Sequence, residues 1–239
     1  MSDFEAAAPG REAWLLHMRR EGEREADALD PDRDDYWEGI GPTHLSFVER
    51  FLSKLPPDGR VLDAACGPGR YFSMVLESGR TVLGVDHTAA YLGNIEANFP
   101  SVHTEKHDLE DLPYRDEFDG LMCVDAMEFV APEDWLRVLG GFRRALRAGG
   151  WLYLTVELVP EVEVRGRNDE ARRSGLPVVS GEVIWAEPEP YYHYYPGIEQ
   201  VRKWLDEAGF AIEGDAEGPW HKQEYAYHHL LARAAGPPG

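Results

Sequence analysis

Residues 61–71 read VLDAACGPGRY and bring a carboxylate and two glycines close together in the chain. Asp63 follows two aliphatic residues, and Gly67 and Gly69 stand on either side of a proline. Glycines let a ligand approach the backbone, because no Cβ stands in the way. A carboxylate beside them can face a cationic group or accept hydrogen bonds. The stretch therefore predicts a ligand-binding turn with Asp63 at its edge.

A second acidic residue stands at the spacing of a nucleotide site. Residues 81–88 read TVLGVDHT, and Asp86 lies 19 residues after Gly67. In a βαβ unit, a carboxylate at this spacing reaches the two hydroxyls of a ribose. NAD and FAD compete as ligands, but their fingerprint expects a third glycine, and bulky side chains follow Gly69 instead. A nucleoside without phosphates fits better. Chance capping of strand ends by the two acids is the alternative.

Strands and helices alternate from residue 59 onward, and this alternation would position the two carboxylates. The patterns predict strands at 60–65, 81–85, 119–124, 151–157, 210–215 and 224–234, and helices at 69–78, 88–98, 133–147 and 198–209. Such alternation is typical of right-handed βαβ units in a parallel sheet covered on both faces. Since ligands bind beyond the carboxyl ends of such strands, we expect Asp63 and Asp86 at the same edge.

The remaining segments predict the domain organisation. Amphipathic helical patterns before residue 56 indicate an N-terminal helical cap over residues 1–58. Residues 59–234 would form the core, and a segment near 160–196 breaks the alternation, as an insertion or lid would. We expect residues 235–239 to be a disordered tail.

Composition and charge limit the kinds of binding partner that we expect. The 239 residues include 24 Lys+Arg against 44 Asp+Glu, a formal net charge of -20, which disfavours nucleic acid and anionic membranes. The two cysteines, Cys66 and Cys123, lie in apolar runs and suggest free thiols in a reducing cytoplasm. No apolar run approaches the roughly 18 residues of a membrane span. We expect a cytoplasmic protein whose partner is a small molecule.

In this order, the motifs resemble those of class I S-adenosylmethionine-dependent methyltransferases. VLDAACGPGRY resembles motif I, and VLGVDHT resembles the ribose-binding strand. KHDLEDLPY (106–114), FDGLMCVDAMEFV (118–130) and RRALRAGGWLYLTV (143–156) resemble the adenine segment, the fourth strand and the helix-Gly-Gly-strand that follow. The likeness covers residues 59–157, with a weaker match at 193–231. It implies a Rossmann-like α/β fold with a seven-stranded, mostly parallel sheet and helices on both faces, and S-adenosylmethionine as cofactor.

The resemblance also implies a cofactor site. Carried onto this sequence, it comprises Asp63, Ala64, Cys66, Gly67, Gly69, Asp86, His87, Asp108, Leu109, Val124, Asp125 and Ala126. Asp63 and the glycine turn would surround the methionine part, Asp86 the ribose, and Asp108 the adenine. One departure stands out: many small-molecule members have His after the Glu of the fourth-strand motif, whereas Phe129 follows Glu128 here. This departure indicates a more apolar acceptor pocket.

An aromatic segment, EPEPYYHYYPG at 187–197, is the most conspicuous candidate for the acceptor site. Its rings would form a substrate wall, with His193 as catalytic base or orienting group, or else a packing loop. The predicted acceptor-binding residues are Trp37, Met127, Glu128, Trp185, Tyr192 and Tyr194. We assign Tyr36 to the cofactor site. Tyr36 and Trp37 either fold over the site, as this region does in similar enzymes, or pack in the core. For Glu128 and Glu157 two roles stay open: they would either contact a polar acceptor or cap strand ends.

The predicted function is methyl transfer from S-adenosylmethionine to an N or O atom of a small aromatic or apolar metabolite, such as one of secondary metabolism. Neither a trio of acids for Mg²⁺ nor a Cys/His spacing for zinc is evident in the sequence, so we expect no metal. Two alternatives stay open. One is non-methylating chemistry on the same cofactor, such as decarboxylation, isomerisation or cyclisation; the other is a non-catalytic module that senses the cofactor. The oligomeric state is left open.

Overall fold

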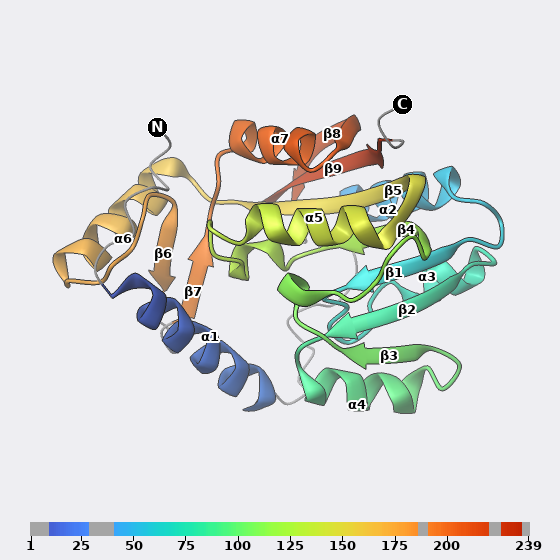
Figure 1. Ribbon diagram of the computed structural model, residues 1–239, viewed down its shortest axis with the longest axis horizontal. Helices are drawn as coiled ribbons and strands as arrows, with labels where there is room; N and C mark the ends of the chain where they lie inside the picture. Colours follow the sequence, from blue (N-terminus) through green and yellow to red (C-terminus); the bar gives the residue numbers. More distant parts are fainter. Residues whose placement is uncertain (1–9, 29–40, 186–190, 220–225, 236–239) are drawn as a thin grey trace.

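A seven-stranded sheet forms the centre of the molecule (Figure 1). The computed structural model describes residues 10–28, 41–185, 191–219 and 226–235. The sheet order is β3-β2-β1-β4-β5-β9-β8. Its strands are β1 (Arg60–Ala64), β2 (Thr81–Asp86), β3 (His103–Lys106), β4 (Phe118–Cys123), β5 (Leu146–Leu158), β8 (Phe210–Pro219) and β9 (Ala226–Ala234). The first five are parallel, and β9 runs antiparallel to both β5 and β8. The predicted fold class is confirmed.

Helices cover both faces of the sheet, because its strands are apolar on both sides. α5 (Trp135–Ala145) and α7 (Ile198–Glu207) pack on the face that carries Leu62. α2 (Pro42–Lys54), α3 (Phe72–Glu77) and α4 (Ala89–Asn98) pack on the face that carries Val61. Neighbouring residues of a strand point to opposite faces, so the run Val61-Leu62 supplies both cores. Strands buried on both faces are typical of parallel sheets.

Residues 160–196, predicted as an insertion or lid, contain a helix and a hairpin beside the sheet. α6 (Glu161–Arg173) precedes the two-stranded sheet of β6 (Glu182–Trp185) and β7 (Tyr191–Tyr194). α1 (Arg11–Ala28) contacts β7 and α4, and Figure 1 shows it running along the side of the hairpin. α2, in contrast, packs directly on the sheet. The division of the chain at residue 58 stays a prediction.

Two predicted boundaries were wrong. The helix predicted at 133–147 ends at Ala145, and the strand predicted from residue 151 begins at Leu146, so Gly149 and Gly150 lie inside β5. The register between β4 and β5 shifts after the pair Phe118–Leu146, so the extra residues are accommodated as an irregularity of the strand. β3 was missed because its sequence, HTEK, is polar and lies at the edge of the sheet.

Candidate active site

The glycine turn after β1 has the conformation that its sequence requires. Gly67 and Gly69 have φ angles of 51° and 79°, in the left-handed region that favours glycine. A Cβ on Gly67 would meet nothing within 4 Å, whereas a Cβ on Gly69 would lie 2.8 Å from the Phe72 ring. Gly69 is therefore required by the packing of Phe72. Gly67 is the glycine whose missing side chain leaves space for a ligand.

Asp86 fixes the shape of this turn. One carboxylate oxygen accepts the Gly67 N–H at 2.9 Å, and the other accepts the Thr88 N–H at 2.8 Å. Sequence analysis assigned Asp86 to a ribose and missed this structural role. Because a carboxylate offers about four lone-pair positions, the two backbone bonds leave capacity for ligand hydroxyls. The ribose contact stays a prediction.

Asp63 is a buried carboxylate with unused hydrogen-bonding capacity. Its side chain lies at the end of β1 and is 2% exposed. Within the described residues its Oδ2 atom has no hydrogen-bond partner. Burial, helped by the charge of Asp86, raises the pKa of Asp63 from 3.8 to about 7. An unpartnered carboxylate beside the open Gly67 fits a ligand that brings a cationic donor, as the ammonium of S-adenosylmethionine would.

The other predicted cofactor residues lie around the same edge of the sheet. Asp108 follows β3, accepts the Glu110 N–H at 2.9 Å and begins the short helix η3 (Leu109–Asp111). His87 follows β2 with its side chain 48% exposed. Cys66 is buried in the turn, and its N–H donates to the Val85 carbonyl at 2.9 Å. Ala64, Val124 and Ala126 are buried where β1 and β4 end. The structure thus brings these residues together without testing their contacts to a cofactor.

A second group of acids gathers beyond the ends of β4 and β5. Asp125 takes a positive φ of 57°, its N–H donates to the Thr155 hydroxyl at 2.8 Å, and the Tyr227 hydroxyl donates to its carboxylate. Glu128, in η4 (Met127–Phe129), is 4% exposed, and Glu157 near the end of β5 is 7% exposed. We call Asp125, Glu128 and Glu157, together with His193, the acceptor-side cluster.

His193 joins this cluster from β7. Its Nδ1 lies 2.7 Å from the Tyr195 hydroxyl and 3.3 Å from Glu157 Oε2. The second distance is that of an ion pair without hydrogen-bond geometry. In the described part of the chain, Glu128 Oε2, Glu157 Oε2 and His193 Nε2 are all buried and make no hydrogen bond. Three buried polar atoms in one cluster thus keep unused capacity.

The electrostatics of the cluster disfavour several negative charges. Burial, followed by the charges of Asp125 and Glu157, raises the pKa of Glu128 well above its ordinary value. Burial also raises the pKa of Asp125, although the hydrogen bond from Tyr227 opposes the rise. Since Glu128 and Asp125 share a hydrogen bond, a proton held between them lowers the local charge.

Aromatic rings surround His193, but two of the predicted wall residues lie elsewhere. Phe129 packs edge-on against His193 with ring centroids 4.7 Å apart, and Tyr191 does so at 5.0 Å. Trp185 donates its indole N–H to the Tyr195 hydroxyl at 3.0 Å. Trp185 and Tyr195 both belong to the predicted aromatic wall, whereas Phe129, which is 59% exposed, was not predicted to contact an acceptor.

Tyr192, Tyr194 and Met127, predicted as acceptor residues, lie in the packed core, and their contact with an acceptor stays a prediction. Tyr192 and Tyr194 alternate with His193 along β7, so they point to the opposite side. Tyr194 packs against Trp135, and Met127 is fully buried in the same core. Tyr192 donates to Glu182 at 2.7 Å. Tyr36 and Trp37 lie outside the described residues.

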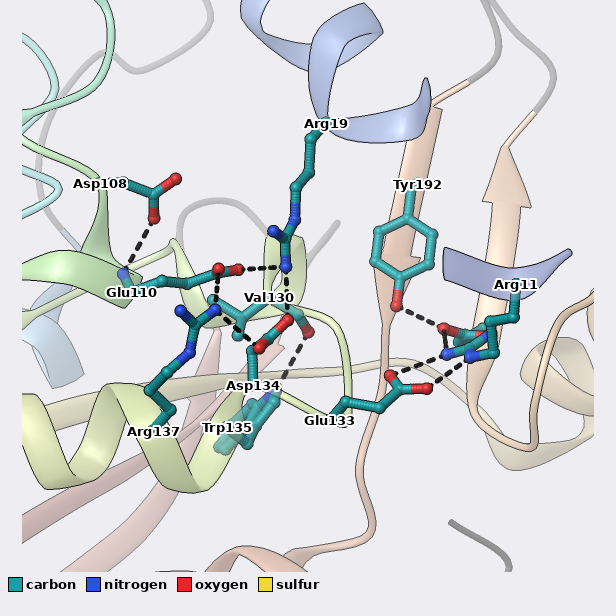
Figure 2. A network of polar contacts seen from close by, with 11 residues as sticks. Arg11, Arg19, Asp108, Glu110, Val130, Glu133, Asp134, Trp135, Arg137 and Tyr192 are labelled. Atoms are coloured by element: carbon teal, nitrogen blue, oxygen red, sulfur yellow. Dashed lines mark hydrogen bonds and ion pairs between the residues drawn. The ribbon is translucent and has the colours of Figure 1, made fainter. Parts of the chain in front are cut away.

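A buried ionic cluster that was not predicted from the sequence joins α1 to the β6–β7 sheet, and Figure 2 shows Arg11, Glu133 and Tyr192 of this cluster. Arg11 is 2% exposed and donates to both Glu182 oxygens, at 2.8 and 2.6 Å, and to Glu133. Glu182 is fully buried and also accepts the Tyr192 hydroxyl and, at 2.6 Å, the Val179 N–H. These hydrogen bonds outweigh desolvation and hold the pKa of Arg11 above its ordinary value. No pattern in the sequence distinguishes these charges from exposed ones.

Among the described residues, no group of three or more His, Cys, Asp or Glu side chains is arranged to hold a metal ion. No helix in the described ranges is both long and apolar enough to cross a membrane.

Part of the chain is similar in sequence to known proteins. Residues 61–150 match the family model described as a methyltransferase domain. An uncharacterized methyltransferase of Synechocystis sp. is 31% identical over 105 residues, which are 44% of this chain and 49% of that protein. The chain thus spans about half the length of this curated relative.

Solved structures confirm the fold over a larger part of the chain. A SAM-dependent methyltransferase from Methanosarcina mazei matches with a TM-score of 0.69 and 17% identity, covering 77% of this chain and 96% of that one. The 1,6-didemethyltoxoflavin-N1-methyltransferase of Burkholderia thailandensis matches with a TM-score of 0.66 and 19% identity, covering 96% and 92%. The family model and the fold confirm the resemblance that the motifs indicated.

Proposed function

We propose, from the premise that residues 61–150 form a methyltransferase domain of the S-adenosylmethionine-dependent class, that this protein methylates a small molecule. The acceptor atom would be a nitrogen or oxygen of a small aromatic metabolite. The observation that carries the proposal is that the open Gly67 turn follows the strand whose Asp63 has a buried Oδ2 atom with no hydrogen-bond partner in the described structure.

The residues of the turn suit the cofactor. Asp63 would receive the ammonium of its methionine part, the space beside Gly67 would admit it, and Asp86 would hold both the turn and the ribose. S-adenosylmethionine supplies a methyl group on a positively charged sulfur, and the electron pair of the broken carbon–sulfur bond stays on that sulfur. The protein therefore has to align the acceptor and, where the acceptor atom carries a proton, remove it.

The acceptor would lie beside the acceptor-side cluster. Phe129, Tyr191 and Trp185 offer flat apolar surfaces, and His193 with Glu157 offers a proton acceptor among them. The Burkholderia enzyme, which aligns with nearly the whole chain, is named for N1 methylation of 1,6-didemethyltoxoflavin. That precedent supports an aromatic acceptor here.

Calorimetric titration with S-adenosylmethionine, S-adenosylhomocysteine and NAD tests the cofactor assignment. We expect both adenosyl compounds to bind and NAD not to bind. Gly67→Ala should weaken adenosyl binding at least tenfold, about 1.4 kcal/mol, because its Cβ enters the space open to the ligand.

Gly175→Ala is the matched control for this substitution. Gly175 also has a positive φ, of 82°, and a Cβ there also meets nothing within 4 Å. Both substitutions strain the backbone in the same way, so a loss of binding in Gly67→Ala alone comes from the ligand site. Equal binding by the two variants, or binding of NAD alone, would overturn the proposed function.

A further inference from the structure

We infer that the acceptor is a planar nitrogen base, held through its N–H groups by Glu128 and Glu157. This inference rests on the proposed function and adds the chemical class of the substrate. It starts from the acceptor-side cluster, which lies at the ends of β4 and β5 and against β7.

The atoms of the acceptor-side cluster that lack a hydrogen-bond partner are mainly hydrogen-bond acceptors. Glu128 Oε2 and Glu157 Oε2 are buried and have no partner with hydrogen-bond geometry in the described chain, although Glu157 Oε2 lies 3.3 Å from His193 Nδ1. Buried carboxylate oxygens are normally paired, and leaving one unpaired costs about 1–3 kcal/mol or more. A ligand with two N–H donors would satisfy both. The buried Nε2 of His193, which likewise has no partner among the described residues, gives a third group that can bind the same ligand.

The negative charge of the cluster further restricts which ligands can bind. The charged groups that act most strongly on Glu128 are two other carboxylates, Asp125 and Glu157. Such a site repels a carboxylate or phosphate ester and favours a cationic or N–H-rich molecule. A phenol offers only one donor, so it would satisfy one carboxylate and leave the other unpaired.

The rings around His193 determine the shape of the ligand. Phe129 and Tyr191 lie edge-on to the imidazole, and Trp185 stacks on Tyr191 with centroids 6.4 Å apart. Aromatic faces beside carboxylates suit a flat, positively polarised ring. An amidine, an aminated heterocycle or a similar base combines this shape with two donors.

Three probes of the same size test the inference: benzamidine, benzamide and benzoate, which are cationic, neutral and anionic. Each is titrated into the full-length protein saturated with S-adenosylhomocysteine. We expect benzamidine to bind at millimolar concentration or below, benzamide more weakly and benzoate not at all. Glu128→Gln and Glu157→Gln should each weaken benzamidine about tenfold, because a charge-assisted hydrogen bond is lost.

Glu161→Gln is the control, since it removes the same charge from a side chain that is 93% exposed. It should leave benzamidine binding unchanged. S-adenosylhomocysteine affinity, measured for every variant, shows that each is folded and that the cofactor site is intact. The comparison of the three probes in the unsubstituted protein needs no variant to fold.

The inference and the proposed function fail in different ways. If S-adenosylhomocysteine does not bind, the proposed function fails. If it binds but benzoate equals benzamidine, no probe binds, or both glutamine variants retain benzamidine affinity, the inference alone fails. It also fails if the glutamine variants lose affinity only for S-adenosylmethionine, because the carboxylates would then serve the sulfonium charge.

Discussion

Two buried glutamates, Glu182 and Glu128, differ in how their charges are compensated. Glu182 is fully buried and receives hydrogen bonds from Arg11, Tyr192 and the Val179 N–H. Glu128 is 4% exposed, its neighbours include two more carboxylates, and its Oε2 has no partner within the described ranges. The first glutamate holds β6 to α1. The second is a carboxyl group whose ionisation is unfavourable in the folded protein unless a ligand compensates the charge.

The degree of hydrogen-bond pairing therefore distinguishes a structural cluster from a functional one better than burial does. Both clusters contain ionisable groups that would be exposed in an average protein. A fully paired cluster fixes geometry, as Arg11 does by donating hydrogen bonds to both Glu182 and Glu133. An incompletely paired cluster reduces stability unless it has a partner. The following predictions test whether the two clusters behave in these opposite ways.

Arg11→Met should have the largest effect. It leaves Glu182 fully buried without its cation, and breaking a buried pair in this way costs about 3–5 kcal/mol. Urea denaturation should show this loss of unfolding free energy. In the double variant Arg11→Met/Glu182→Gln, most of the loss should disappear, because the unpaired charge is also removed. A loss of less than about 1 kcal/mol in Arg11→Met would contradict the structural role of the cluster.

Asp63 should make stability fall as the pH rises. Its pKa is raised from 3.8 to about 7 in the folded protein, so the folded state holds a proton that the unfolded state has released between these values. The free energy of unfolding should therefore lose up to about 1.4 kcal/mol per pH unit through this group. Below pH 3.8 and above pH 7 the contribution should be flat.

Asp63→Asn isolates this contribution. Stability curves of the two proteins, measured from pH 4 to 8, should converge at low pH and separate as Asp63 ionises, with the variant more stable at neutral pH. S-adenosylmethionine should reduce the difference if its ammonium pairs with Asp63. Parallel curves would mean that Asp63 is already ionised at low pH, and that it does not await a cationic partner.

Glu128→Gln should stabilise the ligand-free protein by about 1 kcal/mol, the opposite of what we expect for the Arg11 cluster. The pKa of Glu128 is raised by burial and then by Asp125 and Glu157, so its ionised form is unfavourable in the folded state. Glutamine keeps the size and removes the charge. Thermal unfolding at neutral pH measures the change, and a lower melting temperature would indicate that Glu128 is a structural group like Glu182.

The sequence predicted the sheet and the glycine turn because both depend on local patterns. The alternation of strands and helices, the motif around Gly67 and the spacing to Asp86 are all readable along the chain. Burial on both faces of β1 and β2 follows from their continuous aliphatic runs. The fold was therefore predictable before any contact was known.

The two ionic clusters were not predictable, because they join residues far apart in the sequence. Arg11 and Glu182 are 171 residues apart, and neither has a local signal that marks it as buried. Glu128 and Glu157 were recognised as candidates, but only the structure brings His193 to Glu157. Tyr194 lies on the side of β7 opposite His193 because side chains alternate along the strand, and the register of that strand cannot be deduced from local sequence.

Arg137→Ala should have the smallest effect and shows why burial matters to the comparison. Arg137 pairs with Glu110 and, at 2.7 Å, with Asp134 in the network that Figure 2 shows beside Arg19, so it has as many carboxylate partners as Arg11. Its side chain is 50% exposed, against 2% for Arg11. An exposed pair contributes about 0–1 kcal/mol and is screened by salt. We therefore expect a loss below about 1 kcal/mol that vanishes in 1 M NaCl, while the loss in Arg11→Met persists. Equal, salt-insensitive losses in both variants would mean that the number of ionic partners, and not their burial, decides the stability of these clusters.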